Sequence, residues 1–349
     1  MVEDVNKDLK DRYCKFVSKI PTFKDKQAKL GHWEDAIKSF NLYSVKNCSQ
    51  KLDIIGKIVE GSEFGFRSFY KKYFTNFLFL KDFLLARIIL IGEKISGTIS
   101  NNRITKYEHA RALEFIKKKG LLFEYLEFIK SFGIKSEMQT IRYFYYLKNL
   151  NDVLEKQQIK GKLNFLEIGA GAGGFSLFCF KKISVFRYVI VDLPEMLGYA
   201  AYQILKYRPD LSVVYPDEFN EGLFGKENKP TVYFLLPKQI EYLPENFFNV
   251  ILNFTSFSEM APEEIIRYFS YIYKIGKQGA IFYNVNRVKQ LSKKEEDGVI
   301  INNPLLFPYG NNDEILSFGT DEFHYATRTG IGVIPTMTIS RIARIKSNN

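Results

Sequence analysis

Apolar positions follow helical spacing in the first part of the chain. They recur every three residues over Ile104–Ile116 and over Ile141–Val153, which is typical of amphipathic helices. Helices are also expected at three earlier places, namely Asp35–Tyr43, Leu52–Val59 and the apolar stretch of residues 63–98. The pattern therefore predicts an all-helical N-terminal region over residues 1–155.

After Lys162 the pattern changes, and short apolar runs alternate with helical ones. The expected strands are Asn164–Ile168, Tyr188–Asp192, Val232–Leu236, Asn249–Asn253 and Ala280–Asn284. Helices are expected to begin near Phe175, Pro194 and Pro262. Alternation of this kind is typical of a parallel α/β sheet. Residues 156–349 are therefore predicted to form a doubly wound, mostly parallel sheet.

The end of the chain predicts a pair of strands. Ile334–Ile345 alternates apolar and polar residues, as a half-exposed strand does. Tyr325–Thr329 is the expected partner, across Gly330 and Gly332. The sheet is thus expected to end in an antiparallel strand pair, and the polar segment Lys289–Asp297 is expected to be a solvated loop.

Composition and charge narrow the class of protein only slightly. The 349 residues are 46% hydrophobic and 26% charged, which is ordinary for a globular protein. The net charge of +11 favours anionic partners such as nucleic acid, nucleotide conjugates or a membrane surface, although a solvated, lysine-rich surface explains it as well. No run of five or six basic residues marks a nucleic-acid-binding tail.

Hydropathy and cysteine usage predict a cytoplasmic protein. Charged residues interrupt the most apolar stretch, Phe77–Gly92, which is shorter than the roughly 20 apolar residues of a membrane span. The acidic N-terminus does not resemble a signal peptide. The cysteines are odd in number and widely spaced, at Cys14, Cys48 and Cys179. This argues against a disulfide framework and for a reducing compartment.

A glycine-rich loop follows the first expected strand and fits two templates. Gly169, Gly171 and Gly174 match the dinucleotide fingerprint G-x-G-x-x-G, with Asp192 at about the expected distance. With Glu167 included, the same stretch reads E-x-G-x-G-x-G, which resembles the first motif of class I S-adenosylmethionine (SAM) methyltransferases. In both templates the backbone approaches a ligand and an acid holds ribose hydroxyls.

Glu167 separates the two templates. A carboxylate in a buried strand beside a pyrophosphate would be desolvated and repelled at once. In the methyltransferases the matching acid lies near the cationic methionine part of SAM, where a negative charge is favourable. The sequence therefore indicates SAM as the cofactor.

Three further segments resemble a family of sugar O-methyltransferases, which are class I SAM-dependent enzymes associated with surface-polysaccharide genes. The segments are Tyr188–Leu197, Phe234–Gln239 and Asn253–Met260, and the resemblance extends from Tyr145 to about Arg341. It implies a class I methyltransferase-type sheet preceded by the helical region. It also implies that the substrate is a sugar or nucleotide-linked sugar.

The resemblance also assigns roles to cofactor-binding residues. Gly169, Gly171 and Gly173 would line the methionine and ribose, and Asp192 would take both ribose hydroxyls. Gln239 would approach the adenine, and Leu193 would pack on its face, although packing in the core explains Leu193 equally well. Asn253 would face the methyl-bearing sulfonium. The run Asn253–Ser256 lacks the prolines of nucleic-acid amino-methyltransferases, so DNA N-methylation is not expected.

Two residues are candidates for the base that takes the proton of the acceptor hydroxyl. Glu259 follows the fourth expected strand, although it also suits the start of the helix that Pro262 opens. His324 is one of three histidines, and an unperturbed histidine titrates near neutrality. No cluster of His and Cys indicates a metal site.

Two other functions stay open at this point. An RNA methyltransferase is suggested by the charge and by the 32 Phe and 22 Tyr residues. The second alternative is a non-catalytic protein that retains the methyltransferase fold. The helical region is expected either to cap the cleft or to form a homodimer interface.

Overall fold

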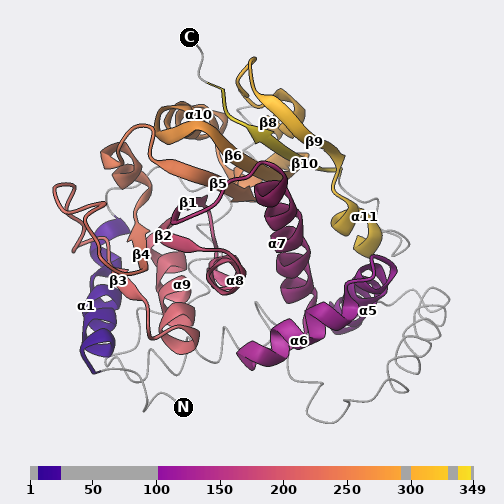
Figure 1. The fold of residues 1–349 in the computed structure, drawn as a ribbon, viewed down its shortest axis with the longest axis horizontal. Coiled ribbons are helices and arrows are strands. Elements are labelled where there is room, and N and C mark those ends of the chain that lie inside the picture. The colour runs from indigo at the N-terminus through magenta and orange to yellow at the C-terminus, as the bar shows by residue number, and fades with distance from the viewer. Residues whose placement is uncertain (1–6, 25–100, 292–299, 329–336, 347–349) are drawn as a thin grey trace. The chain divides into compact units, whose positions relative to one another are not determined.

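The computed structural model describes residues 7–24, 101–291, 300–328 and 337–346 (Figure 1). The helices expected between residues 35 and 98 lie outside this part of the chain. The described residues fall into two compact units. We call residues 7–24, 150–291, 300–320 and 337–346 the sheet unit, and residues 101–149 and 321–328 the helical unit.

An eight-stranded sheet forms the centre of the sheet unit. Its strands are β1 (Leu163–Ile168), β2 (Val185–Val191), β3 (Ser212–Val214), β4 (Thr231–Leu235), β5 (Phe248–Phe254), β6 (Gly276–Arg287), β9 (Glu314–Thr320) and β10 (Thr338–Arg344). They lie in the order β3-β4-β2-β1-β5-β6-β10-β9. All neighbours are parallel except that β10 is antiparallel to both β6 and β9. The predicted α/β sheet with a terminal antiparallel pair is therefore confirmed.

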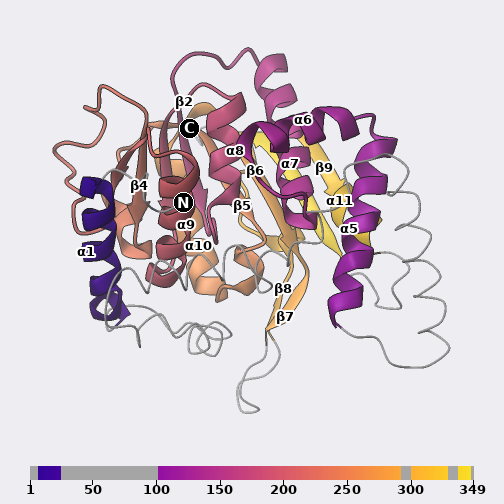
Figure 2. The ribbon, with the colours of Figure 1, turned by 90° about the horizontal axis from the view of Figure 1, so that it is seen from below.

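Helices cover the sheet because its strands are apolar on both faces. All six residues of β1 are buried. On one face Leu166 and Ile168 share a core with Phe269 of α10 (Pro262–Ile275). Helices α8 (Gly174–Lys182), α9 (Pro194–Tyr207) and α1 (Lys7–Lys24) also belong to this unit, and Figure 2 shows them alongside the strands. α1 packs on α9, where the Tyr13 hydroxyl donates to the Gly198 carbonyl at 3.1 Å.

The expected partner of the last strand is wrong. Tyr325 lies in helix α11 (Glu322–Arg328), and β10 pairs instead with β9. The reason is local: Asp321 Oδ1 accepts from the backbone N–H of His324 at 2.8 Å, which caps the start of a helix. β9 precedes that cap and supplies the edge strand.

The described part of the helical unit contains α11 and three longer helices. These are α5 (Asn101–Lys118), α6 (Leu122–Phe132) and the first part of α7 (Met138–Lys156). Phe115 of α5 packs edge-on against Phe323 of α11 at 5.7 Å. The helices predicted over Ile104–Ile116 and Ile141–Val153 are confirmed. The compact units divide the chain at several points, so a domain border at residue 155 stays a prediction.

A short two-stranded ribbon and one cysteine depart from expectation. Lys289–Leu291 forms β7, which pairs with β8 (Ile300–Asn302), so the expected loop begins as a strand. Cys14 is disulfide-bonded, against the expectation from three widely spaced cysteines, whereas Cys179 is a free, buried thiol. Among the described helices, none combines the length and apolar character that crossing a membrane requires.

Candidate functional site

The glycine loop lies at the point where the order in which the chain adds strands to the sheet reverses. From β1 the chain moves outward through β2 to the edge strand β3 and then to β4, and it returns to the other side of β1 to form β5 and β6. Ligands of such sheets bind outside the carboxyl ends of the strands at this switch point. Gly169–Gly173 follows β1 there, and Thr255 and Ser256 follow β5.

Gly169, Gly171 and Gly173 differ in how much space a side chain would have at each position. All have positive φ, which disfavours other residues. A Cβ on Gly169 would lie 2.2 Å from Cβ and Oγ of Ser256, and one on Gly173 would lie 2.8 Å from Cβ of Ala200. A Cβ on Gly171 would meet nothing closer than Met196 Cε at 3.9 Å. Gly169 and Gly173 therefore permit close packing of the protein itself, whereas Gly171 stays accessible to a ligand.

Asp192 joins the carboxyl end of β2 to the glycine loop. Its Oδ2 accepts from the Gly171 N–H and its Oδ1 from the Leu193 N–H, both at 2.7 Å. Burial raises the pKa of Asp192 to about 7, and the two backbone N–H groups partly oppose this rise. Each carboxylate oxygen keeps a second acceptor site, so a pair of hydroxyls could still be bound. Leu193 is half-buried beside it.

Glu167 lies inside the core directly before the loop. It is 2% exposed and accepts from the Tyr188 hydroxyl at 2.7 Å. Burial raises the pKa of Glu167 to about 7, the Tyr188 hydrogen bond lowers it, and the charge of Asp192 raises it further. Glu167, the residue from which the sequence predicted SAM, is thus a buried carboxyl group with a neutral hydrogen-bond partner and a second acid nearby.

Asn253 and Gln239 both use their amides on the protein. Asn253 is fully buried, and its Nδ2 donates to the Ile168 carbonyl at 2.9 Å and to Ser256 Oγ at 2.5 Å. Gln239 follows β4, accepts from the Leu236 N–H and donates to the Pro216 carbonyl, both at 2.9 Å. Both side chains fix loops at the carboxyl edge, and their predicted contacts with sulfonium and adenine stay predictions.

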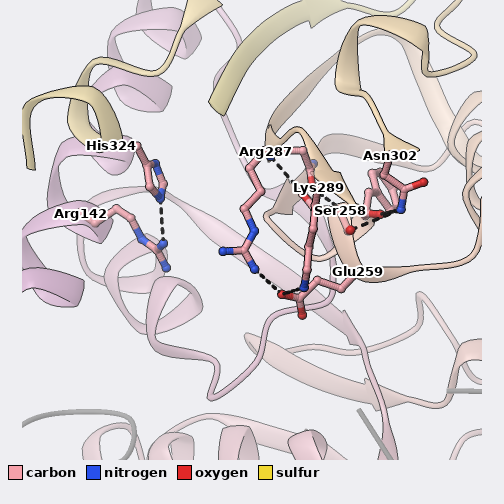
Figure 3. A network of polar contacts seen from close by, with 9 residues as sticks. Arg142, Ser258, Glu259, Arg287, Lys289, Asn302 and His324 are labelled. Atoms are coloured by element: carbon pink, nitrogen blue, oxygen red, sulfur yellow. Dashed lines mark hydrogen bonds and ion pairs between the residues drawn. The ribbon is translucent and has the colours of Figure 1, made fainter. Parts of the chain in front are cut away.

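Glu259 lies in a cluster of charges after β5. Its Oε1 accepts from Arg287 Nη2 at 2.6 Å and from Lys289 Nζ at 3.0 Å (Figure 3). The carboxylate is 14% exposed. Both cations bind the same oxygen of this carboxylate, which is the arrangement of a counter-ion.

His324 belongs to the helical unit and has an acidic partner there. Its Nδ1 lies 2.7 Å from Asp321 Oδ1 and 3.2 Å from the Tyr146 hydroxyl. Its Nε2 lies 3.5 Å from Arg142 Nη1 (Figure 3). Because arginine only donates, Nε2 accepts and Nδ1 carries the proton toward Asp321. This is the orientation in which a carboxylate supports a histidine base.

An antiparallel strand, β10, lies between β6 and β9 at one end of an otherwise parallel sheet. This is the class I methyltransferase fold. No protein-family model matches the chain, and no curated protein matches it.

Three solved structures resemble the chain weakly. The [4+2]-cyclase SpnF is 16% identical with a TM-score of 0.39, and the match covers 61% of this chain and 84% of SpnF. A SAM-dependent methyltransferase from Methanosarcina mazei is 16% identical with a TM-score of 0.37, covering 56% and 97%. Phosphoethanolamine N-methyltransferase 2 from Haemonchus contortus, in complex with SAM, is 13% identical with a TM-score of 0.38, covering 57% and 52%. Likeness at this level does not extend to substrate.

Sequence reasoning missed a buried polar network beside the switch point of the sheet. Asn286 of β6 donates from Nδ2 to Asn253 Oδ1 at 2.7 Å and also contacts Asn284. Its Oδ1 accepts from both the N–H and the hydroxyl of Ser258 at 3.0 Å. The only sequence signal was the pair Asn284 and Asn286 on one face of an apolar strand, where polar residues need partners.

Within the described residues, no group of three or more His, Cys, Asp or Glu side chains is arranged to hold a metal ion.

Proposed function

We propose that this chain is a SAM-dependent O-methyltransferase that transfers a methyl group to a hydroxyl of a sugar, carried by a nucleotide or a surface-polysaccharide precursor. The observation that carries the proposal is Asp192, a carboxylate bound to the Gly171 N–H at the switch point of a class I sheet. Its remaining acceptor sites suit the two hydroxyls of a ribose.

Glu167 supports SAM over a dinucleotide. It is a buried carboxyl whose hydrogen-bond partner Tyr188 is neutral, and Asp192 adds a second acid. A cationic sulfonium ligand would favour its charged form, whereas a pyrophosphate would oppose it. SAM would supply the electrophilic methyl group, and the protein would orient the acceptor oxygen in line with it.

Asn253 supports an oxygen acceptor over an amine. In amino-methyltransferases of nucleic acid, a residue at this position holds the target amine. Here the Asn253 amide oxygen accepts from Asn286 at 2.7 Å, and the side chain is fully buried. The sugar itself rests on the resemblance of Tyr188–Leu197, Phe234–Gln239 and Asn253–Met260 to sugar O-methyltransferases.

His324 is the base we propose for the acceptor hydroxyl, in preference to Glu259. Asp321 holds the Nδ1 proton at 2.7 Å and would stabilise the imidazolium that forms. Arg142 would have to leave Nε2 for the proton to arrive there. We expect His324→Gln to lower kcat for methyl transfer by about 100-fold or more with unchanged affinity for S-adenosylhomocysteine. An unchanged kcat would assign the proton to another group.

Calorimetric titration with S-adenosylhomocysteine tests the cofactor. The wild type should bind, and Asp192→Asn should weaken binding about tenfold or more, because one charged acceptor is lost. Asp210→Asn is the matched control, since Asp210 is a surface acid paired with Arg208 at 2.7 Å. Equal affinities of all three proteins would contradict the assignment of Asp192. Transfer of labelled methyl groups to RNA, with every nucleotide sugar inert, would contradict the acceptor.

A further inference from the structure

The charge cluster after β5 contains more positive charge than its own acid neutralises. Glu259, Arg287 and Lys289 together carry one net positive charge, and both cations contact the same carboxylate oxygen. The side chains are partly desolvated, with exposed fractions of 14% for Glu259, 19% for Lys289 and 28% for Arg287. When partly buried cations outnumber the anions beside them, binding of a further anion is favourable.

Arg287 has donors that the protein does not use. Its Nε is buried without a hydrogen-bond partner among the described residues. Figure 3 shows one end of the guanidinium directed at Glu259 and the other directed away from it. Because Nε is buried and Nη2 donates to Glu259, the terminal nitrogen directed away from Glu259 is the Arg287 donor that an anion could reach.

The cluster belongs to the edge of the sheet where ligands bind. Arg287 ends β6, Lys289 begins β7, and Glu259 follows β5, so all three lie past the carboxyl ends of strands. The strand register places Tyr283 of β6 level with Glu167 of β1, two strand spacings or about 10 Å away, and Arg287 lies four residues further along β6 in the direction of the carboxyl edge. A contiguous chain of hydrogen bonds runs from Asn286, next to Arg287, through Asn253 to the Ile168 carbonyl before the glycine loop.

We infer that Arg287 and Lys289 form a phosphate-binding subsite for the methyl acceptor, with Glu259 as the positioning residue that holds both cations in place. This inference rests on the proposed function and makes it narrower. The acceptor carries a phosphate group, as a nucleotide-linked sugar does, and a neutral sugar lacks the group that the subsite binds. Glu259, a candidate base from the sequence, becomes a counter-ion.

Pyrophosphate is the probe that tests the subsite without turnover. Titration of the full chain at saturating S-adenosylhomocysteine should show binding to the wild type. Arg287→Gln and Lys289→Gln should each weaken it about tenfold or more, as expected for one charge-assisted hydrogen bond. Arg267→Gln is the matched control, because Arg267 pairs with Glu264 at 2.8 Å on helix α10 and should leave binding unchanged. Arg287→Lys keeps the charge but has one nitrogen in place of two terminal ones, so it cannot bind Glu259 and the anion through separate nitrogens, and it should bind pyrophosphate with intermediate affinity.

Three results separate the possible failures. A wild type that binds S-adenosylhomocysteine but not pyrophosphate would overturn the subsite and leave the proposed function intact. Pyrophosphate binding that Arg287→Gln, Lys289→Gln and Arg267→Gln reduce equally would also overturn it, since that pattern reflects overall charge. If the wild type binds pyrophosphate but not S-adenosylhomocysteine, and the variants change pyrophosphate binding as expected, the subsite is supported and the proposed cofactor is refuted. Thermal melting of Arg287→Lys shows whether the fold is preserved.

Discussion

At the scale of single residues, the glycines of the loop perform different tasks. A sequence motif treats Gly169, Gly171 and Gly173 as equivalent ligand-facing positions. The structure shows that Gly169 makes room for Ser256 and Gly173 for Ala200, whereas Gly171 donates its N–H to Asp192. The motif could be read from spacing alone. The tasks could not, because they depend on residues 21 to 87 positions further along the chain.

This difference predicts unequal effects of alanine in the loop. Gly171→Ala should lower the free energy of unfolding by about 1–2 kcal/mol, the cost of a left-handed backbone for an L-residue. Gly169→Ala has the same backbone cost and a Cβ 2.2 Å from Ser256, so it should lose about 1–3 kcal/mol more. Denaturant unfolding measures both.

The double variant Gly169→Ala/Ser256→Gly checks the cause. Removing the Ser256 side chain should recover much of the additional loss, because the pair interacts directly. Equal losses for Gly169→Ala and Gly171→Ala in the wild-type background would show that the contact with Ser256 carries no penalty.

The candidate site was predictable in part for a related reason. Glu167, Asp192 and the glycines stand next to strand ends, where parallel topology brings them together. Arg287 and Lys289 gave no comparable signal, because lysine and arginine are common throughout the chain. Their contact with Glu259 and their partial burial distinguish them from solvated surface cations, and neither can be read from the sequence.

At the scale of elements, strands buried on both faces were the easiest to predict. Each of the five central strands, such as Phe248–Phe254, is an apolar run with a charged or polar break beyond it. The edge strand β9 was missed, since Glu314–Thr320 is exposed along most of its length and carries no clear alternation. α11 was mistaken for a strand, although Asp321 gave a capping signal that could have identified its start.

One buried ion pair shows how the loop of residues 303–313 is held in place. Asp313 accepts from Arg341 of β10 at 2.8 Å and from the Tyr273 hydroxyl of α10 at 2.6 Å. The Arg341 guanidinium lies 4.1 Å from the centre of the Tyr309 ring. Nothing in the local sequence of residues 303–313 reveals these partners, which come from α10 and the last strand. Such loops are specified by long-range contacts.

At the scale of the whole molecule, two acids with a raised pKa should make stability depend on pH. Burial raises the pKa of Glu167 and of Asp192 to about 7 in the folded protein, above the usual range of unfolded carboxyl groups. Between about pH 4 and pH 7 the folded state therefore binds more protons than the unfolded state. The free energy of unfolding should fall across this window as pH rises.

Glu167→Gln isolates one contribution. Gln keeps an acceptor for Tyr188 and cannot ionise, so the loss between pH 4.5 and pH 8 should shrink by up to about 3 kcal/mol. Chemical denaturation at both pH values measures it. Glu314→Gln is the control, because this half-exposed acid pairs with Lys346 at 3.4 Å. A wild type that gains stability from pH 5 to pH 7, unaltered in Glu167→Gln, would contradict the buried-acid account.

The division into compact units could not be predicted from the sequence. The change of pattern near residue 160 marks where strands begin, yet α1 packs with the sheet and α11 with the helices. Helix α7 contributes residues 138–149 to one unit and 150–156 to the other. Secondary-structure patterns report local preference, and membership of a unit is decided by contacts between distant segments.

The contact between the glycine loop and the turn after β5 has a consequence for biosynthesis. Asn253 and Ser256 bind the Ile168 carbonyl from 85 and 88 positions further along the chain. Pairings of such long range form late, after local helices and hairpins. While a ribosome is still adding the residues after β2, the loop therefore lacks the side chains that hold it. A nascent chain stalled before residue 256 should contain the whole glycine motif and still have an incomplete loop.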